Sequence, residues 1–148
     1  MASAAVWPQK RDVGYSPVVG QKVVSASLHK MMTHSVETIK RRSDFLRVSR
    51  SCQSNAAPGL VLQASFNSRY PNKIRIGFTA TRRIGGSVKR NRARRRLRAA
   101  VERVMPHHAA IGYDYVLVAR IVTIDRPFES LIQDLETALK RLKVWRES

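Results

Sequence analysis

The segment of residues 87–105 constrains the fold most, because it is strongly basic and yet has the apolar spacing of a helix. Seven of the ten residues of KRNRARRRLR are Lys or Arg. At about 100° per residue, a helix would gather four apolar residues within an arc of roughly 60°: Ala93, Leu97, Ala100 and Val104. Pro106 should end this helix. The segment therefore predicts a helix with one buried side and one cationic side.

The cationic side has no acid to balance it. No Asp or Glu occurs between Asp44 and Glu102, an interval that holds half of all Lys and Arg residues. Like charges four residues apart destabilise a helix by roughly a few tenths of a kcal/mol per pair. A merely solvated face is the alternative, but such faces usually mix both signs. Since the Arg guanidinium suits bidentate phosphate contacts, we expect this side to bind a polyanion.

Composition supports the same class of partner. The chain has 148 residues, enough for one core, and 28 Lys and Arg against 10 Asp and Glu, a formal charge of +18. Nucleic acid is the polyanion that such an excess favours. No stretch of 18 apolar residues could span a membrane, and the N-terminus lacks the pattern of a secretory signal. A single cysteine, Cys52, excludes an intrachain disulfide and a Cys-based zinc site and fits a cytoplasmic protein.

No arrangement typical of an active site is visible. The chain has four histidines, of which His107 and His108 are expected in a solvated loop after the basic helix. The acids show no metal-ligand spacing, and no Ser/His/Asp or Cys/His set is suggested. We therefore expect neither catalytic residues nor a metal site in the protein itself.

The chain divides into an extension and one domain. Residues 1–36 lack a sustained period and are interpreted as a disordered extension, although Trp7 and Tyr15 could instead dock on the domain. Residues 37–146 form the predicted domain. Its elements are a helix over residues 44–50 capped by Ser43, strands over 60–66, 73–81 and 113–121, the basic helix, and a last helix over 126–144. We expect an α+β protein, a small two-layer sandwich of order αβββαβα, in which one of the three strands before the basic helix has no assigned residue range.

One face of the sheet should be open to a partner. In the strand over residues 73–81, Arg75 and Thr79 point away from the apolar side. Beside a helix that carries Phe45, they would line a groove suited to single-stranded RNA. Phe45 has an alternative role as a core residue under its helix. No helix-turn-helix or zinc spacing accompanies the basic helix, which weakly favours RNA over DNA.

The segment TRRIGGSVKRNRARRRLR resembles the signature of the bacterial ribonuclease P protein subunit. The likeness lies in the basic pair Arg82 and Arg83, the Gly85 turn, Ser87 and Val88, and the run Arg90-Asn91-Arg92 followed by Arg94 and Arg95. It extends from about Thr38 to Lys143 through IKRRSDFLRV, RIGFT, YDYVLVAR and PFESL. Residues 1–36 fall outside it.

The resemblance implies a division of labour. In this family a catalytic RNA removes the 5′ leader of precursor transfer RNA with Mg²⁺ held mainly by the RNA, and the protein assists without a stable protein partner or a membrane. It implies contacts to the catalytic RNA by Arg82, Arg83, Lys89, Arg90, Asn91, Arg92, Arg94, Arg95 and Arg98. It implies contacts to the leader by Phe45, Arg47, Arg75 and Thr79, in a cleft between the first helix and the sheet.

The family fold resembles the second domain of ribosomal protein five of the small subunit, with a left-handed βαβ crossover. Two positions depart from the family pattern, since Ser49 and Gln63 stand where relatives often carry aromatic residues. A ribosomal or other structured-RNA-binding protein is the main alternative function, and a DNA-bending protein the next.

Overall fold

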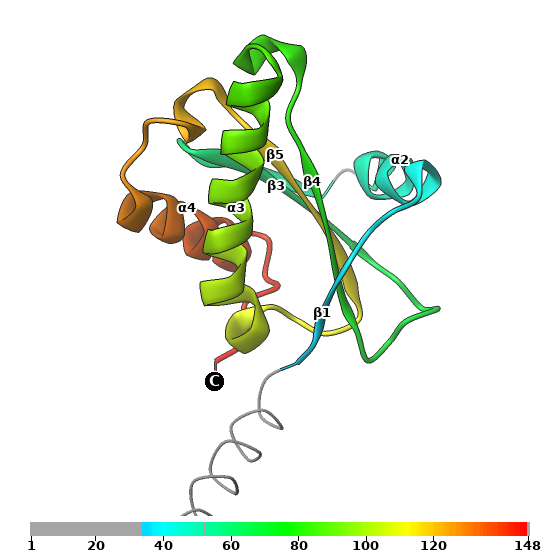
Figure 1. The fold of residues 1–148 in the computed structure, drawn as a ribbon. Helices are drawn as coiled ribbons and strands as arrows, with labels where there is room; N and C mark the ends of the chain where they lie inside the picture. Colours follow the sequence, from blue (N-terminus) through cyan, green and yellow to red (C-terminus); the bar gives the residue numbers. More distant parts are fainter. Residues whose placement is uncertain (1–33, 52, 148) are drawn as a thin grey trace, which may run out of the picture. The chain divides into compact units, whose positions relative to one another are not determined.

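The computed structural model describes residues 34–51 and 53–147, which form a mixed sheet with helices (Figure 1). In chain order the elements are β1 (Val36–Thr38), α2 (Arg42–Arg50), β2 (Ser54–Ala56), β3 (Leu60–Phe66), β4 (Ile74–Thr79), η1 (Arg82–Ile84), α3 (Ser87–His108), β5 (Tyr113–Ala119), η2 (Ile121–Thr123) and α4 (Phe128–Arg141). The sheet has five strands in the order β1-β4-β5-β3-β2. This confirms the predicted α+β class and, from α2 onward, the order αβββαβα.

Helices lie on both faces of the sheet, whereas the two-layer sandwich expected from the sequence has helices on one face only. Side chains alternate along β5, so Tyr115 and Leu117 join the large core under α3 and α4, while Val116 joins a second cluster with Val48 of α2. Figure 1 shows α3 and α4 on one side of the strands and α2 on the other. The face under α2 is the one that the sequence left open to a partner.

Helix α3 connects β4 to β5, which are adjacent and parallel. The predicted apolar stripe packs against the sheet, because Ala93, Leu97 and Ala100 are fully buried and Val104 is 2% exposed. Periodicity therefore identified both the helix and its buried side. The left-handed sense of this crossover stays a prediction.

The end of α3 corrects two expectations. The helix continues through Pro106 to His108, since Ala109 still donates its backbone N–H to the Met105 carbonyl at 3.1 Å. The Pro106 carbonyl accepts from the backbone N–H of His34 at 3.3 Å. His107 and His108 are thus half-buried in the last turn, not in a solvated loop. The ring of His108 stacks on Trp145, with centroids 4.1 Å apart. This stack fastens the C-terminal segment to α3.

Other boundaries also differ from the sequence-based expectation. Arg41, not Ser43, is the N-cap of α2, and no side chain caps that helix. The last helix begins after Pro127, which fixes its own φ near the helical value but cannot donate a hydrogen bond. Strand β1 was not predicted, and the order αβββαβα included β2 without a residue range. Each has three residues, too short to show an alternating pattern.

The predicted extension overlaps the domain at its end. Val36 pairs with Ile74 in β1, so the domain begins before residue 37. The disorder predicted for residues 1–33, and the alternative in which Trp7 and Tyr15 dock, lie outside the described residues.

Candidate nucleic-acid interface

The outer side of α3 carries the charge that the sequence indicated. We call Lys89, Asn91, Arg92, Arg94, Arg95 and Arg98 the basic face of α3; all are exposed except Arg94, which is half-buried. Arg94 donates from Nη1 to Asn91 Oδ1 at 3.2 Å. Within the described residues, no carboxylate lies within salt-bridge distance of these cations. The face therefore presents its charge to solvent without internal compensation.

The basic face is also hollowed. A shallow depression of about 470 Å³ is lined by Val88 and four residues of the face, Asn91, Arg94, Arg95 and Arg98. Val88 is 79% exposed and gives the depression an apolar edge. An apolar contact surrounded by guanidinium groups can accept both the sugar and the phosphate of a nucleic-acid backbone.

The residues before and within the first turn of α3 differ in accessibility. Arg82 and Arg83 are exposed on η1, and Gly85 follows with φ 137°, a value that L side chains rarely adopt. This turn directs the arginines of η1 and α3 to the surface together. Arg90 is half-buried, with its Nε enclosed and unpaired, so it is less accessible than Arg92.

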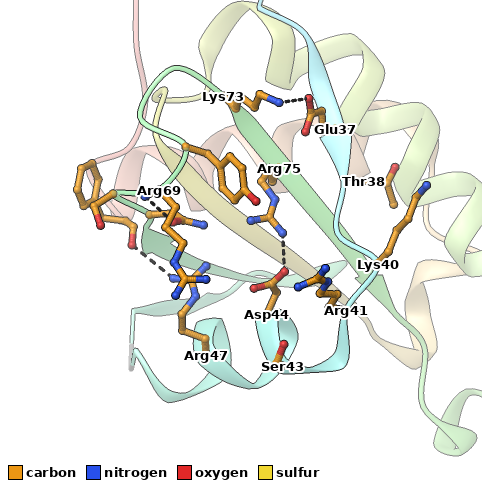
Figure 2. A pocket seen from close by; sticks show the side chains of 14 residues that line it. Glu37, Thr38, Lys40, Arg41, Ser43, Asp44, Arg47, Arg69, Lys73 and Arg75 are labelled. Atoms are coloured by element: carbon orange, nitrogen blue, oxygen red, sulfur yellow. Dashed lines mark hydrogen bonds and ion pairs between the residues drawn. The ribbon is translucent and has the colours of Figure 1, made fainter.

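A second candidate site lies at the other helix. The α2 groove, as we name it, is a cavity of about 750 Å³ between β1, the start of α2 and the turn of residues 67–73 (Figure 2). Its lining includes six cations, Lys40, Arg41, Arg47, Arg69, Lys73 and Arg75, and two acids, Glu37 and Asp44. The groove is thus cationic overall, because these two acids balance only part of its positive charge.

Arg75 forms the floor of the groove and is held by acids. Its side chain is 10% exposed, and Nη2 donates to Asp44 Oδ2 at 2.6 Å, a bond drawn in Figure 2. Nη1 lies 3.4 Å from Asp114 Oδ2. Burial by itself would lower the pKa of Arg75, but the hydrogen bond to Asp44 and the charges of Asp114 and Asp44 outweigh it and raise that pKa above its ordinary value. Arg75 is a fixed cation.

Asp114 anchors a second arginine at the same place. Its side chain is 1% exposed, and Oδ2 accepts from Arg47 Nη2 and from Asn67 Nδ2. Because Asn67 lies in the turn and Arg47 on α2, this one carboxylate of β5 ties both walls of the groove together. Arg47 keeps a side-chain exposure of 38% and can still reach a ligand.

The other two predicted leader residues lie elsewhere. Phe45 is half-buried and packs with Ile39, Val48 and Val116 in the cluster under α2, as its alternative role required. Thr79 is half-buried near the end of β4. Neither lines the α2 groove, so the structure brings together Arg47 and Arg75 but not Phe45 and Thr79.

The sequence reasoning missed the residues of the turn. Residues 67–72 stood only as the connection between the predicted strands over 60–66 and 73–81, yet Arg69 and Tyr70 line the groove, as does Lys73 beside them. The available signal was an aromatic residue between cations inside a turn. Lys40 and Arg41 were likewise visible as basic residues but carried no motif of their own.

The described part of the chain has neither a cluster of metal ligands nor a membrane-spanning helix. No group of three or more His, Cys, Asp or Glu side chains there could hold a metal ion. No helix there is both long and apolar enough to cross a membrane.

Comparisons with known proteins agree with each other. The chain is 48% identical over 114 residues to the ribonuclease P protein component of Paramagnetospirillum magneticum, covering 75% of this chain and 86% of that one. It is 39% identical over 108 residues to the protein of the same description from Ruegeria pomeroyi, covering 72% and 86%.

Solved structures show the same fold. The RNase P protein of Staphylococcus aureus superposes with a TM-score of 0.64 at 25% identity, covering 76% of this chain and all of that one. The protein from Thermotoga maritima gives a TM-score of 0.60 at 24% identity, with coverage of 71% and 96%, and shows the fold alone. The family model described as Ribonuclease P matches residues 33–143, which include both candidate sites. This chain therefore belongs to the ribonuclease P protein family.

Proposed function

We propose that this protein is the RNA-binding subunit that assists a catalytic RNA in removing the 5′ leader of precursor transfer RNA. Membership of the family implies a role in ribonuclease P and partnership with its RNA. The observation that carries the finer proposal is the basic face of α3, whose cations have no carboxylate partner within the described domain. A polyanion would supply the missing charge.

The two candidate sites would serve two parts of the RNA. The basic face of α3, with Arg82, Arg83 and Arg90, binds the structured catalytic RNA through phosphates. The α2 groove, with Arg47 and Arg75, binds the single-stranded leader; Phe45 supports it from α2 and Thr79 from β4. A broad exposed helix face suits a folded RNA surface, whereas a groove suits a flexible single-stranded leader.

The chemistry would belong to the RNA. Mg²⁺, held mainly by the catalytic RNA, would supply the activation of water, and the described residues offer no group of three or more acids, histidines or cysteines that could hold such an ion themselves. The protein's own residues bind and orient the substrate and screen the phosphates of the two RNAs from each other. We accordingly propose that the protein alone does not cleave precursor transfer RNA, needs no stable protein partner and acts in the cytoplasm.

Reconstitution tests this function. The full chain is added to a matching ribonuclease P RNA at limiting Mg²⁺, and release of the leader from a precursor is measured. We expect faster cleavage with the wild-type protein and a clear loss with Arg92→Ala/Arg95→Ala. The control Arg141→Ala/Lys143→Ala removes the same charge from exposed residues at the end of α4 and should behave as wild type.

Three results would contradict the proposal. Tight binding to the RNA without any effect on leader removal would favour a structured-RNA-binding protein of another kind, such as a ribosomal protein. Cleavage by RNA-free protein would place catalytic residues in the chain. Equal losses in both double variants would show that total charge, and not the basic face, matters.

A further inference from the structure

The α2 groove contains an exposed aromatic ring to which the resemblance assigns no role. Positions 49 and 63 carry Ser and Gln, so the aromatic residues expected on α2 and β3 are absent there. Tyr70, in the turn between β3 and β4, is 40% exposed and lines the groove. A surface tyrosine in a cationic groove is the kind of residue on which an unpaired base stacks.

The ring of Tyr70 is held in place by cations beneath it. The guanidinium carbon of Arg75 lies 4.6 Å from the ring centroid, and Nζ of Lys73 lies 5.6 Å from it. Lys73 and Arg75 are two residues apart, so they point to the same side of the chain. Arg75 is itself held by ion pairs with Asp44 and Asp114, so the guanidinium that contacts the ring is restrained. The exposed part of Tyr70 therefore needs little further ordering to receive a ligand.

Other cations of the groove remain available for phosphate. Lys73 pairs with Glu37 at 2.7 Å and Arg75 with Asp44, two pairs that Figure 2 draws as dashed lines. In contrast, no carboxylate of the described residues lies within salt-bridge distance of Lys40, Arg41 or Arg69. Lys40 and Arg41 lie on the approach to α2, and Arg69 lies in the turn across the cavity from them (Figure 2).

We propose that Tyr70 forms a nucleotide subsite in which an unpaired base of single-stranded RNA stacks on its open face. The neighbouring phosphates lie against Arg41 and Arg69, while the acid-held Arg75 supports the ring from the other side. The inference rests on the proposed function, because the leader of the precursor is the single strand that would occupy the groove. In this proposal the stacking residue lies in the turn between β3 and β4 and not on α2 or β3. Phe45 is instead packed into the cluster under α2.

Binding of precursor to the reconstituted holoenzyme tests the subsite. Three variants are compared with wild type: Tyr70→Phe, which keeps the ring; Tyr70→Leu, which keeps the bulk; and Tyr70→Ala. With a long-leader precursor, Tyr70→Leu and Tyr70→Ala should weaken binding about 5- to 150-fold, the range that base–aromatic stacking gives, and Tyr70→Phe should stay within about twofold. With a precursor lacking a leader, all four proteins should bind alike.

A scan of the leader with single abasic nucleotides makes the test independent of folding. In the wild-type holoenzyme, one leader position should show a loss of binding when its base is removed. In Tyr70→Leu the same abasic position should cause no further loss, because the stacking partner is already gone. Thermal melting of each variant without RNA confirms that the domain is intact.

The outcomes separate this inference from the function on which it rests. If wild-type protein does not stimulate leader removal, the proposed function fails. If it does, but Tyr70→Leu binds long-leader precursor as wild type, or the abasic loss persists undiminished in Tyr70→Leu, the nucleotide subsite is wrong and the proposed function stands. Equal losses with and without a leader would assign Tyr70 a purely structural role and overturn the inference as well.

Discussion

The ring of Phe45 lies against the backbone of Gly77, so closely that a Cβ atom on residue 77 would overlap the ring. The contact brings α2 onto β4 at the one point of the strand without a side chain. It sets how near the helix approaches the sheet, and thereby the width of the α2 groove beside it.

Replacing Gly77 by Ala should therefore displace Phe45. We expect a loss of roughly 1–3 kcal/mol in the free energy of unfolding, typical of overpacking, measured by urea denaturation. Gly86→Ala is the matched control, because an added Cβ there meets nothing within 4 Å. A Gly77→Ala protein as stable as wild type would show that α2 can shift freely.

Two substitutions of Phe45 distinguish packing from RNA contact. Phe45→Leu should retain most of the stability and, if Phe45 only supports the groove, most of the binding of leader-bearing precursor. Phe45→Ala should lower the free energy of unfolding by about 1–3 kcal/mol, less than a fully buried Phe would, since Phe45 is half-buried. It should impair binding of precursor more than binding of the catalytic RNA. A large loss of precursor binding in Phe45→Leu would instead indicate direct stacking.

The basic face of α3 predicts a salt dependence. If Arg92 and Arg95 each contact a phosphate, the log–log slope of RNA affinity against salt should become shallower by roughly 0.7–0.9 per residue replaced with Ala. The variant should fold as well as wild type, because both residues are exposed and their removal relieves repulsion along the helix. Filter binding at several salt concentrations measures the slope. An unchanged slope would mean that this face is only solvated.

Asp114→Asn tests the anchor of the groove. The substitution keeps the shape but removes the charge that holds Arg47 and Arg75, leaving Arg75 with Asp44 alone. We expect the free energy of unfolding to fall by roughly 1–3 kcal/mol, the cost of weakening a buried charged network. Asp125→Asn, at an exposed acid, should cost little. Equal stability of the two variants would exclude a structural role for the network.

Tyr115 predicts a difference at high pH. Burial, with a smaller effect of Tyr113, raises the pKa of Tyr115, and its hydroxyl donates to the Ala110 carbonyl at 2.8 Å. The folded state thus holds the phenol proton more tightly than the unfolded state. The resulting stability is complete below the ordinary Tyr pKa of about 10 and falls as pH rises above it.

Tyr115→Phe cannot titrate at this position. Its free energy of unfolding should start lower near neutral pH, through loss of the hydrogen bond, but should decline less steeply above pH ~10, by up to about 1.4 kcal/mol per pH unit. Denaturation measured from pH 9 to 11 compares the slopes. Parallel curves would show that Tyr115 ionises as easily in the folded protein as in the unfolded one.

The parts of the fold that sequence could predict are those with a local repeat. The stripe from Ala93 to Val104 was visible because all of it lies on one helix. The burial of Arg75 could not be predicted, because strand alternation shows only that its side chain points to the other face of the sheet from Ile74 and Ile76. What covers it is Asp44 from another element and Asp114 from a strand far along the chain, and no local pattern reports such a meeting.

The candidate interface divides in the same way. The cationic side of α3 was predicted from charge and spacing, and the resemblance implied which of its residues contact RNA. The resemblance implied a cleft between the first helix and the sheet. The exposed ring of Tyr70, however, lies in a segment that was expected only to connect two strands. A residue such as Tyr70, whose proposed role depends on where the fold places it, cannot be recognised from a single sequence.

Because α3 joins two adjacent parallel strands, the helix that carries the charge is also a step in folding. The pairing of Ile74 with Tyr113 spans the whole of α3, and such distant pairings are reached slowly. Repulsion among the arginines of α3 disfavours the helix in the free chain. Multivalent anions such as sulfate should therefore speed refolding, because they reduce that repulsion.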